Sequence, residues 1–180
     1  MSGTPGGARF AAVDVHYPPT GGARAACVVT ADPRFGEVVA EHVVFLAEVA
    51  PYRPGEFFVR ELPALRAVLA HAGQLDLLVV DGYVDLDPDG RPGLGAHAHA
   101  EFDVAVVGVA KTAFRGAVHA IPVCRGQASR PLYVTAAGLP RTEAADLVKH
   151  MAGRYRLPDA LRRVDALARS VPAGSPDSRS

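Results

Sequence analysis

The sequence predicts a single α/β domain built on one mixed β-sheet with helices on both faces. Three apolar segments near the N-terminus are separated by short turns, as in an antiparallel meander. Two later segments are continuous apolar runs, which are typical of parallel strands buried on both faces. Helical patterns precede and separate these two runs, and the 180 residues fit one domain with a substantial core.

The meander accounts for the first part of the chain. Its strands are expected at residues 10–17, 23–30 and 37–49, which are rich in apolar and β-branched residues. Turns containing proline and glycine separate them. Asp14 interrupts the apolar middle of the first strand, so its carboxylate needs a cation or a place at the edge of the sheet.

A stiff loop follows the meander. Pro51 and Pro54 fix their own backbone angles and favour extended conformations in the residues before them, and the loop ends at Gly55. Tyr52 is therefore expected to be held out on a rigid segment. An isolated tyrosine in such a loop is most often an ordinary surface residue, so the loop alone does not define a function.

A helical pattern extends from residue 57 to residue 69, with Pro63 inside it. Either the helix begins near residue 62 with Pro63 at its first position, or it is kinked at Pro63. Both alternatives place Glu61 at an irregular, accessible point.

The rest of the chain continues the alternation of strands and helices. In chain order we expect an apolar strand at 74–80 closed by Asp81, a short helix at 93–102, strands at 104–109, 117–123 and 131–135, a helix with Thr142 as its N-cap, and a last helix that begins at Leu157-Pro158-Asp159. Residues 1–8 and 170–180 are expected to be disordered, which leaves 9–169 as the folded domain.

Composition excludes several classes of protein. The formal net charge is zero, which argues against strong sequence-independent binding of polyanions. Local arginines can still bind nucleic acid. No apolar run approaches the roughly 20 residues of a membrane span, and the N-terminus lacks the apolar core of a signal peptide. Cys27 and Cys124 are interpreted as reduced core residues. We expect a cytoplasmic monomer that does not bind membranes.

Three acids carry the predicted chemistry. If the first strand lies beside the strand that ends at Asp81, then Asp14 and Asp81 converge near the centre of the sheet and Glu61 can close over them. Three carboxylates without a fixed cation favour a hard divalent ion, and Mg²⁺ held by carboxylates and water suits phosphodiester hydrolysis. The alternative is that Asp14 pairs with an arginine and Asp81 only caps a turn.

The chain resembles the endonuclease V family over residues 10–168. The motifs that carry this resemblance occur in the family's order and approximate spacing, and it is their combination that is specific. They are Ala12-Val13-Asp14-Val15, Pro51-Tyr52-Arg53-Pro54-Gly55, Arg60-Glu61, Val80-Asp81-Gly82, Gly93-Leu94-Gly95-Ala96-His97, Gly108-Val109-Ala110-Lys111 and Tyr155-Arg156-Leu157-Pro158.

The resemblance implies a ribonuclease H-like fold and an endonuclease that depends on Mg²⁺, with Mn²⁺ as a substitute. It implies a substrate of inosine-containing DNA, with RNA as a further candidate. The implied cut is at the second phosphodiester bond 3′ to hypoxanthine, leaving 3′-hydroxyl and 5′-phosphate ends, in the repair of deaminated adenine.

Specific residues match the positions that carry these functions in the family. The resemblance assigns the metal to Asp14, Glu61 and Asp81, and it adds His97, Lys111 and Asp165 to the catalytic residues. It makes Tyr52 a wedge that fills the base stack while the damaged base rotates out, a task for which a proline-flanked loop is suited. Pro54, Gly55 and Gly82 then belong to the substrate-binding residues, because glycine permits close approach of the backbone to the base.

The chain also departs from the family pattern. Val84 stands near the position of a second glycine, Asp87 replaces a histidine before Pro88, and the stretch 135–138 lacks its histidine. These changes affect the predicted base pocket more than the metal acids. A related nuclease of altered base specificity and a non-catalytic nucleic-acid-binding relative are therefore the alternatives.

Overall fold

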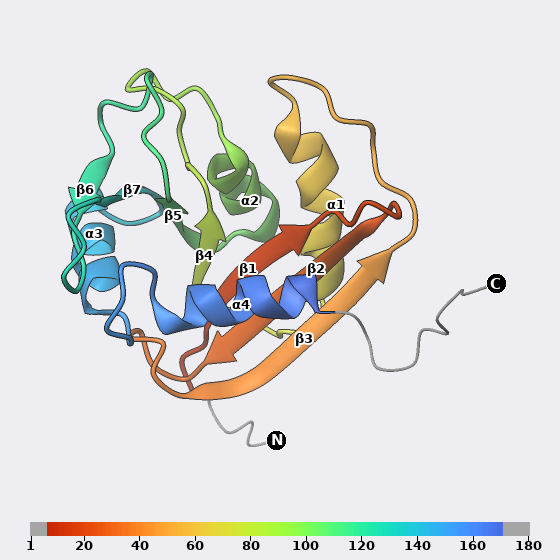
Figure 1. The fold of residues 1–180 in the computed structure, drawn as a ribbon, viewed down its shortest axis with the longest axis horizontal. Coiled ribbons are helices and arrows are strands. Elements are labelled where there is room, and N and C mark those ends of the chain that lie inside the picture. The colour runs from red at the N-terminus through yellow and green to blue at the C-terminus, as the bar shows by residue number, and fades with distance from the viewer. Residues whose placement is uncertain (1–6, 171–180) are drawn as a thin grey trace.

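The computed structural model describes residues 7–170 and contains, within them, a seven-stranded mixed sheet and four helices (Figure 1). The sheet order is β3-β2-β1-β4-β5-β7-β6. The predicted meander and the two buried runs are confirmed as parts of one sheet. The disorder predicted for the two termini falls largely on residues 1–6 and 171–180, which lie outside the described residues.

The elements closely follow the ranges expected from the sequence. The strands are β1 (Phe10–His16), β2 (Ala23–Thr30), β3 (Val38–Leu46), β4 (Leu77–Asp81), β5 (Ala105–Ala110), β6 (Ile121–Val123) and β7 (Leu132–Ala137). The helices are α1 (Phe57–Leu69), α2 (Leu94–Phe102), α3 (Arg141–His150) and α4 (Asp159–Arg169).

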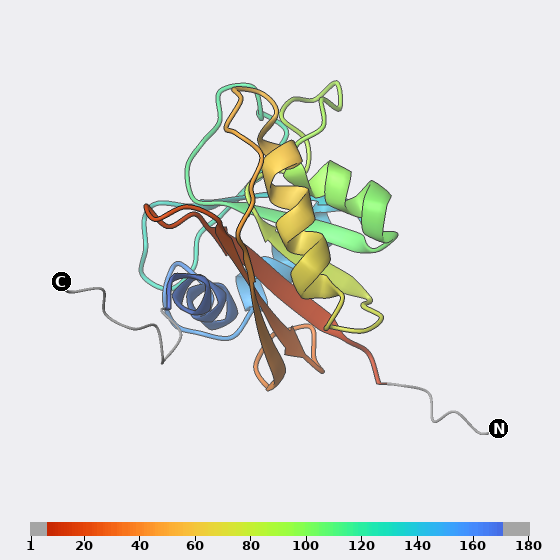
Figure 2. The ribbon, with the colours of Figure 1, turned by 90° about the vertical axis from the view of Figure 1, so that its right-hand side faces the viewer.

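The helices cover both faces of the sheet, as Figure 2 shows with α4 on one side and α1 and α2 on the other. One core joins the sheet to α3 and α4 through residues such as Val148 and Val164. The second core joins the opposite face to α1 and α2 through Leu65, Val68 and Ala98. Because both faces are covered, the central strands are apolar along almost their whole length.

The strand order brings two of the predicted acids together. β1 pairs with β4 in parallel, and Val13 is the register partner of Val80. Asp14 and Asp81 are the next residues in each strand, so they leave the sheet side by side at the carboxyl ends of adjacent parallel strands. Since side chains alternate between the two faces, both acids lie on the face that α4 covers.

The prediction for Glu61 was wrong in one respect. The helix α1 begins at Phe57 and runs through Pro63, and Glu61 is a helical residue that is 8% exposed. Pro63 removes one helical hydrogen bond, at a cost of about 3 kcal/mol. The buried face that includes Leu65 and Val68 packs on the sheet and offsets this cost.

Three smaller expectations were also wrong. Thr142 is the second residue of α3, whose N-cap is Pro140, and no side chain caps that helix. Cys124 is exposed, whereas Cys27 is buried as expected. The strand expected at residues 117–123 is limited to β6, because residues 114–120 form hydrogen-bonded turns. In the described part of the chain, no helix is long and apolar enough to span a membrane.

Candidate active site

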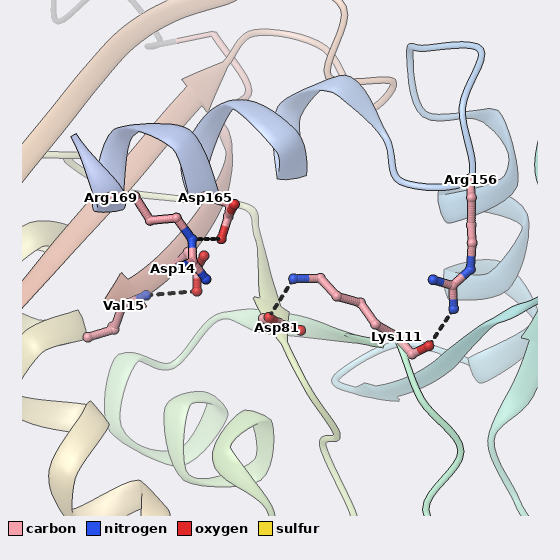
Figure 3. A network of polar contacts seen from close by, with 7 residues as sticks. All are labelled: Asp14, Val15, Asp81, Lys111, Arg156, Asp165 and Arg169. Atoms are coloured by element: carbon pink, nitrogen blue, oxygen red, sulfur yellow. Dashed lines mark hydrogen bonds and ion pairs between the residues drawn. The ribbon is translucent and has the colours of Figure 1, made fainter. Parts of the chain in front are cut away.

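Four carboxylates line one cavity of about 340 Å³ at the carboxyl ends of β1 and β4. β1 supplies Asp14, β4 supplies Asp81, α1 supplies Glu61 and α4 supplies Asp165. Lys111, which follows β5, lies on the same wall. Five of the six residues predicted to be catalytic are therefore gathered from five separate elements, and Figure 3 shows Asp14, Asp81, Lys111 and Asp165 facing one another.

Asp14 lies in an environment that opposes its negative charge. Burial and the nearby charge of Asp81 raise the pKa of Asp14 from 3.8 to about 7, although a hydrogen bond from the Val15 N–H to Oδ1, at 2.9 Å, favours the carboxylate. Contact with the Asp165 carboxyl raises it further. Asp14 thus carries an incompletely compensated charge, which a bound cation would stabilise.

Glu61 shows the same effect more strongly. The pKa of Glu61 rises from 4.5 to about 8. Burial of the side chain is the largest cause, and repulsion from Asp14 and Asp81 adds to it. Arg60 opposes this rise only in part, because its guanidinium lies over the Tyr17 ring, 3.8 Å from the centroid. The helix therefore presents a buried acid to the cavity without an equivalent cation.

The other two acids each have a cationic partner. Lys111 Nζ lies 3.1 Å from Asp81 Oδ2, and although burial opposes the charge of Lys111, attraction to Asp81 raises its pKa. Arg169 Nε lies 2.9 Å from Asp165 Oδ1. Burial opposes ionisation of Asp165, but hydrogen bonds from Arg169 and Asp14 lower its pKa. The alternative in which an arginine pairs with Asp14 is not what the structure shows, because Arg169 pairs with Asp165.

These acids do not form a closed ligand shell. Within residues 7–170, no three histidine, cysteine, aspartate or glutamate side chains are close enough together to hold a metal ion as they stand. The donor set nevertheless fits a hard divalent cation, because it consists of carboxylate oxygens whose raised pKa values at Asp14 and Glu61 report missing positive charge.

A second cavity, of about 410 Å³, adjoins the first. Asp81 and Phe57 belong to the walls of both cavities. Gly55 and Gly82 line the second cavity and have φ angles of 81° and 107°, which side chains other than glycine rarely adopt. Two of the residues predicted to bind the base therefore line an apolar pocket next to the acids, and their role in binding a base stays a prediction.

The loop that carries Tyr52 leads towards this second cavity. Tyr52 is 61% exposed, and its ring meets the edge of Phe57, with centroids 6.5 Å apart. Pro54 is exposed beside Gly55. An exposed aromatic ring on a proline-flanked loop beside the cavity is the geometry that was predicted, and its role as a wedge stays a prediction.

His97 is the one predicted catalytic residue that lies outside the walls of the acidic cavity. It sits in α2, and its ring stacks on Phe58, with centroids 3.7 Å apart. Burial lowers the pKa of His97, which favours the neutral form of the ring. Phe58 lines the second cavity, which places His97 behind the wall of that pocket.

Sequence reasoning assigned no role at the site to three residues around the acids. Arg169 and Tyr17 line the acidic cavity, and Arg156 donates a hydrogen bond to the backbone oxygen of Lys111 (Figure 3). Tyr17 and Arg156 reach the site through the packing of segments that are far apart in the chain, so no local pattern identifies them. An arginine four residues after Asp165 on a helix was the one available signal.

Carboxylates at the ends of the central strands of a ribonuclease H-like sheet define a nuclease. The chain belongs to the endonuclease V family, because the family model "Endonuclease V" matches residues 4–138. Asp165 lies beyond that match. The protein is thus an endonuclease of the hydrolase class.

Individual relatives agree with this assignment. An endonuclease V from Rhodospirillum centenum is 33% identical over 165 residues, which cover 79% of this chain and 68% of the relative. The crystal structure of endonuclease V from Streptomyces avermitilis is 28% identical, with a TM-score of 0.75, over 92% of this chain and 81% of that one. Endonuclease V from Ciona intestinalis, in complex with an inosine-containing DNA, is 16% identical with a TM-score of 0.70, over 89% of this chain and 83% of that one. It shares the fold.

Proposed function

We propose that this protein is a Mg²⁺-dependent endonuclease that cuts strands containing hypoxanthine, the base left when adenine is deaminated. The proposed cut is at the second phosphodiester bond 3′ to the damaged base, with 3′-hydroxyl and 5′-phosphate products, in DNA repair. Inosine-containing RNA is a further candidate substrate. The observation that carries the proposal is the cavity lined by Asp14, Glu61, Asp81 and Asp165 beside an apolar pocket.

Asp14, Glu61 and Asp81 are the residues proposed to hold the metal ion. When bound, Mg²⁺ would activate water and stabilise charge on the phosphate, and Mn²⁺ would substitute for it. The raised pKa values of Asp14 and Glu61 support this role, because these acids are the two without a cationic partner of their own. Asp165, held by Arg169, orients its carboxyl towards Asp14.

Lys111 is proposed to neutralise phosphate charge. Its side chain is 41% exposed, and its ammonium group pairs with Asp81 in the cavity wall, so a phosphate that enters can replace or share this contact. Its backbone oxygen accepts a hydrogen bond from Arg156, which fixes the start of the side chain. Lys111 therefore needs only a rotation of its side chain to change partners.

The pocket of 410 Å³ is the proposed site of the rotated base. Aromatic rings of Phe58, Tyr83 and Phe114 supply flat surfaces for stacking, and Gly55 and Gly82 line the pocket without side chains that would keep a base away from the backbone. The Ciona relative of the same fold binds an inosine-containing DNA, which supports the same class of substrate here. Tyr52, at the edge of Phe57, is proposed to fill the vacated stack.

A second candidate function is cleavage with an altered base preference. The loop after β4 differs from the family pattern, and Asp87 has a structural role there, since its Oδ1 accepts hydrogen bonds from the N–H groups of Asp89 and Arg91 at 3.0 Å. This places Arg91 in the wall of the base pocket. A guanidinium there would favour a base that presents acceptors, such as the O6 and N7 of hypoxanthine or guanine.

One experiment separates these candidates. Matched DNA and RNA oligonucleotides with a single inosine, guanine or adenine are incubated with and without Mg²⁺, and the product ends are mapped. Inosine-selective, Mg²⁺-dependent cutting that Asp14→Ala abolishes would support the proposal. Equal cutting of inosine and adenine strands would contradict the base specificity, and cutting that survives Asp14→Ala would contradict the assigned site. The cytoplasmic location and the monomeric state stay predictions.

A further inference from the structure

A group of arginines surrounds Tyr155 where the loop before α4 meets the helix. The guanidinium carbons of Arg154 and Arg162 lie 4.9 and 4.6 Å from the centroid of the Tyr155 ring. Together with Arg156 and Gln127 they line a hollow of about 700 Å³. We call Arg154, Tyr155, Arg156 and Arg162 the arginine–tyrosine patch.

The patch is positively charged in a chain whose formal net charge is zero. Asp159 is the acid that contacts it, 3.9 Å from Arg162 Nη1, and both side chains of that pair are more than half exposed. An exposed pair at this distance leaves Arg162 available to another anion. Arg154 is also exposed, and its Nη2 donates to the Tyr155 hydroxyl at 2.7 Å.

A buried arginine fixes the shape of the patch. Arg125 is 4% exposed, and it donates hydrogen bonds to the backbone oxygens of Tyr155 at 2.8 Å and Gly153 at 3.0 Å. Gly126 has a φ of 59°, and a Cβ there would lie 2.2 Å from the backbone oxygen of Arg154. The loop is thus held in place, and Arg154 and Arg162 stay exposed, whereas the guanidinium of Arg156 is bonded to the backbone oxygens of Arg130, Lys111 and Pro131.

The patch lies next to the proposed cleavage site. Arg156 bonds to the backbone oxygen of Lys111, whose ammonium group pairs with Asp81 (Figure 3). Arg162 precedes Asp165 by three residues on α4, a rise of about 4.5 Å along the helix. Successive phosphates of a DNA strand are separated by a rise of about 3.4 Å along the helix axis. When a strand lies with its cleaved bond at the acids, phosphates a few nucleotides from that bond can therefore reach the patch.

We infer that the arginine–tyrosine patch binds the sugar–phosphate backbone of the substrate strand beside the bond that is cut. Guanidinium groups match phosphate geometry, and an exposed tyrosine ring between them offers a surface for a sugar or an unstacked base. Binding of this kind does not depend on base sequence. The inference rests on the proposed function, because it assumes that a strand is cut at Asp14 and Asp81.

The test is the salt dependence of binding. Affinity for an inosine duplex of about 30 base pairs is measured by fluorescence anisotropy without Mg²⁺ for wild type and for the double variant R154Q/R162Q. Loss of two phosphate contacts should weaken binding about tenfold or more and lower the slope of log K against log salt by about two. The control R66Q/R163Q removes two arginines that pair with Glu101 and Glu41, outside the patch, and should retain the wild-type slope.

Further readouts exclude indirect effects. The conservative variant R154K/R162K should recover most of the slope, because lysine keeps the charge. Cleavage by R154Q/R162Q should show a raised KM with kcat unchanged, and circular dichroism should show an unchanged melting temperature. A wild-type slope in R154Q/R162Q, or an equal loss in the R66Q/R163Q control, would overturn the inference.

The two proposals fail in different ways. If wild type cuts inosine strands but the patch variant binds them like wild type, the patch inference is wrong and the proposed function stands. If wild type does not cut inosine strands, the proposed function is wrong whatever the patch variant does.

Discussion

Replacing Glu61 by glutamine should stabilise the metal-free protein at alkaline pH. The raised pKa of about 8, compared with 4.5 for the free side chain, corresponds to a cost of about 4 kcal/mol for carrying this acid in the folded state at about pH 8. Part of that cost is repulsion from the carboxylates of Asp14 and Asp81. Protonation of Asp14 and the ion pair between Lys111 and Asp81 both reduce this repulsion. We therefore expect E61Q to raise the free energy of unfolding by about 2 kcal/mol, or the melting temperature by about 4–8 °C.

The pH dependence follows from the sign of the shift. Because the folded-state pKa of Glu61 lies above the unfolded value, wild type is stabilised at low pH and loses that stability as the pH rises from 4.5 through about 8. The gain from E61Q should accordingly shrink to less than about 0.5 kcal/mol at about pH 5. Adding Mg²⁺ at alkaline pH should stabilise wild type more than E61Q, since a ligand that binds the folded state raises its stability.

The assay is urea unfolding in the presence of a chelator at several pH values. The exposed Glu56, five residues earlier, provides a matched control, and E56Q should change stability by less than about 0.5 kcal/mol. If E61Q is no more stable than wild type at alkaline pH, or if its gain is the same at acid pH, the acids are not mutually repelling as described.

Three further predictions concern single side chains. Lys111→Met should lower the cleavage rate constant about 10²-fold under single-turnover conditions, because one charge that faces the phosphate is lost; an unchanged rate would contradict its role. Tyr52→Ala should lower kcat/KM for an inosine duplex about tenfold, whereas Tyr52→Phe should keep most activity, because the ring fills the stack; equal activity of both variants would refute the wedge. Arg125→Met should lower the free energy of unfolding by about 3 kcal/mol in urea, since it leaves several buried carbonyl oxygens unpaired; a near-neutral effect would mean that water replaces the guanidinium.

The sheet and the position of two acids could be predicted because each depends on local sequence. Continuous apolar runs that end in Asp81 and surround Asp14 predict buried strands that each carry an acid. The expected topology permits these two strands to be neighbours, and the structure shows that they pair. Glu61 lines the same cavity as Asp14 and Asp81, as the sequence predicted, but it is buried rather than accessible. The local effect of Pro63 suggested an irregular backbone, whereas packing of α1 on the sheet kept the helix intact.

Contacts between distant residues could not be predicted in the same way. Arg125 donates to backbone oxygens about 30 residues away, and nothing around it in the sequence distinguishes it from other arginines. The stacking of His97 on Phe58 is likewise set by how α2 packs against α1. The acids that the resemblance indicated line one cavity, and their role as metal ligands stays a prediction. The resemblance could not show that Lys111 already pairs with Asp81.

The most direct test of the central claim is a Mg²⁺ titration of single-turnover cleavage of an inosine strand. Wild type should show saturable dependence on Mg²⁺, and Asp14→Asn should cut about 10³-fold more slowly at every Mg²⁺ concentration. The control Asp146→Asn, at an exposed acid on α3, should match wild type. Cleavage by Asp14→Asn at the wild-type rate, or wild-type cleavage that does not depend on Mg²⁺, would contradict the claim that the acidic cavity is the cleavage site.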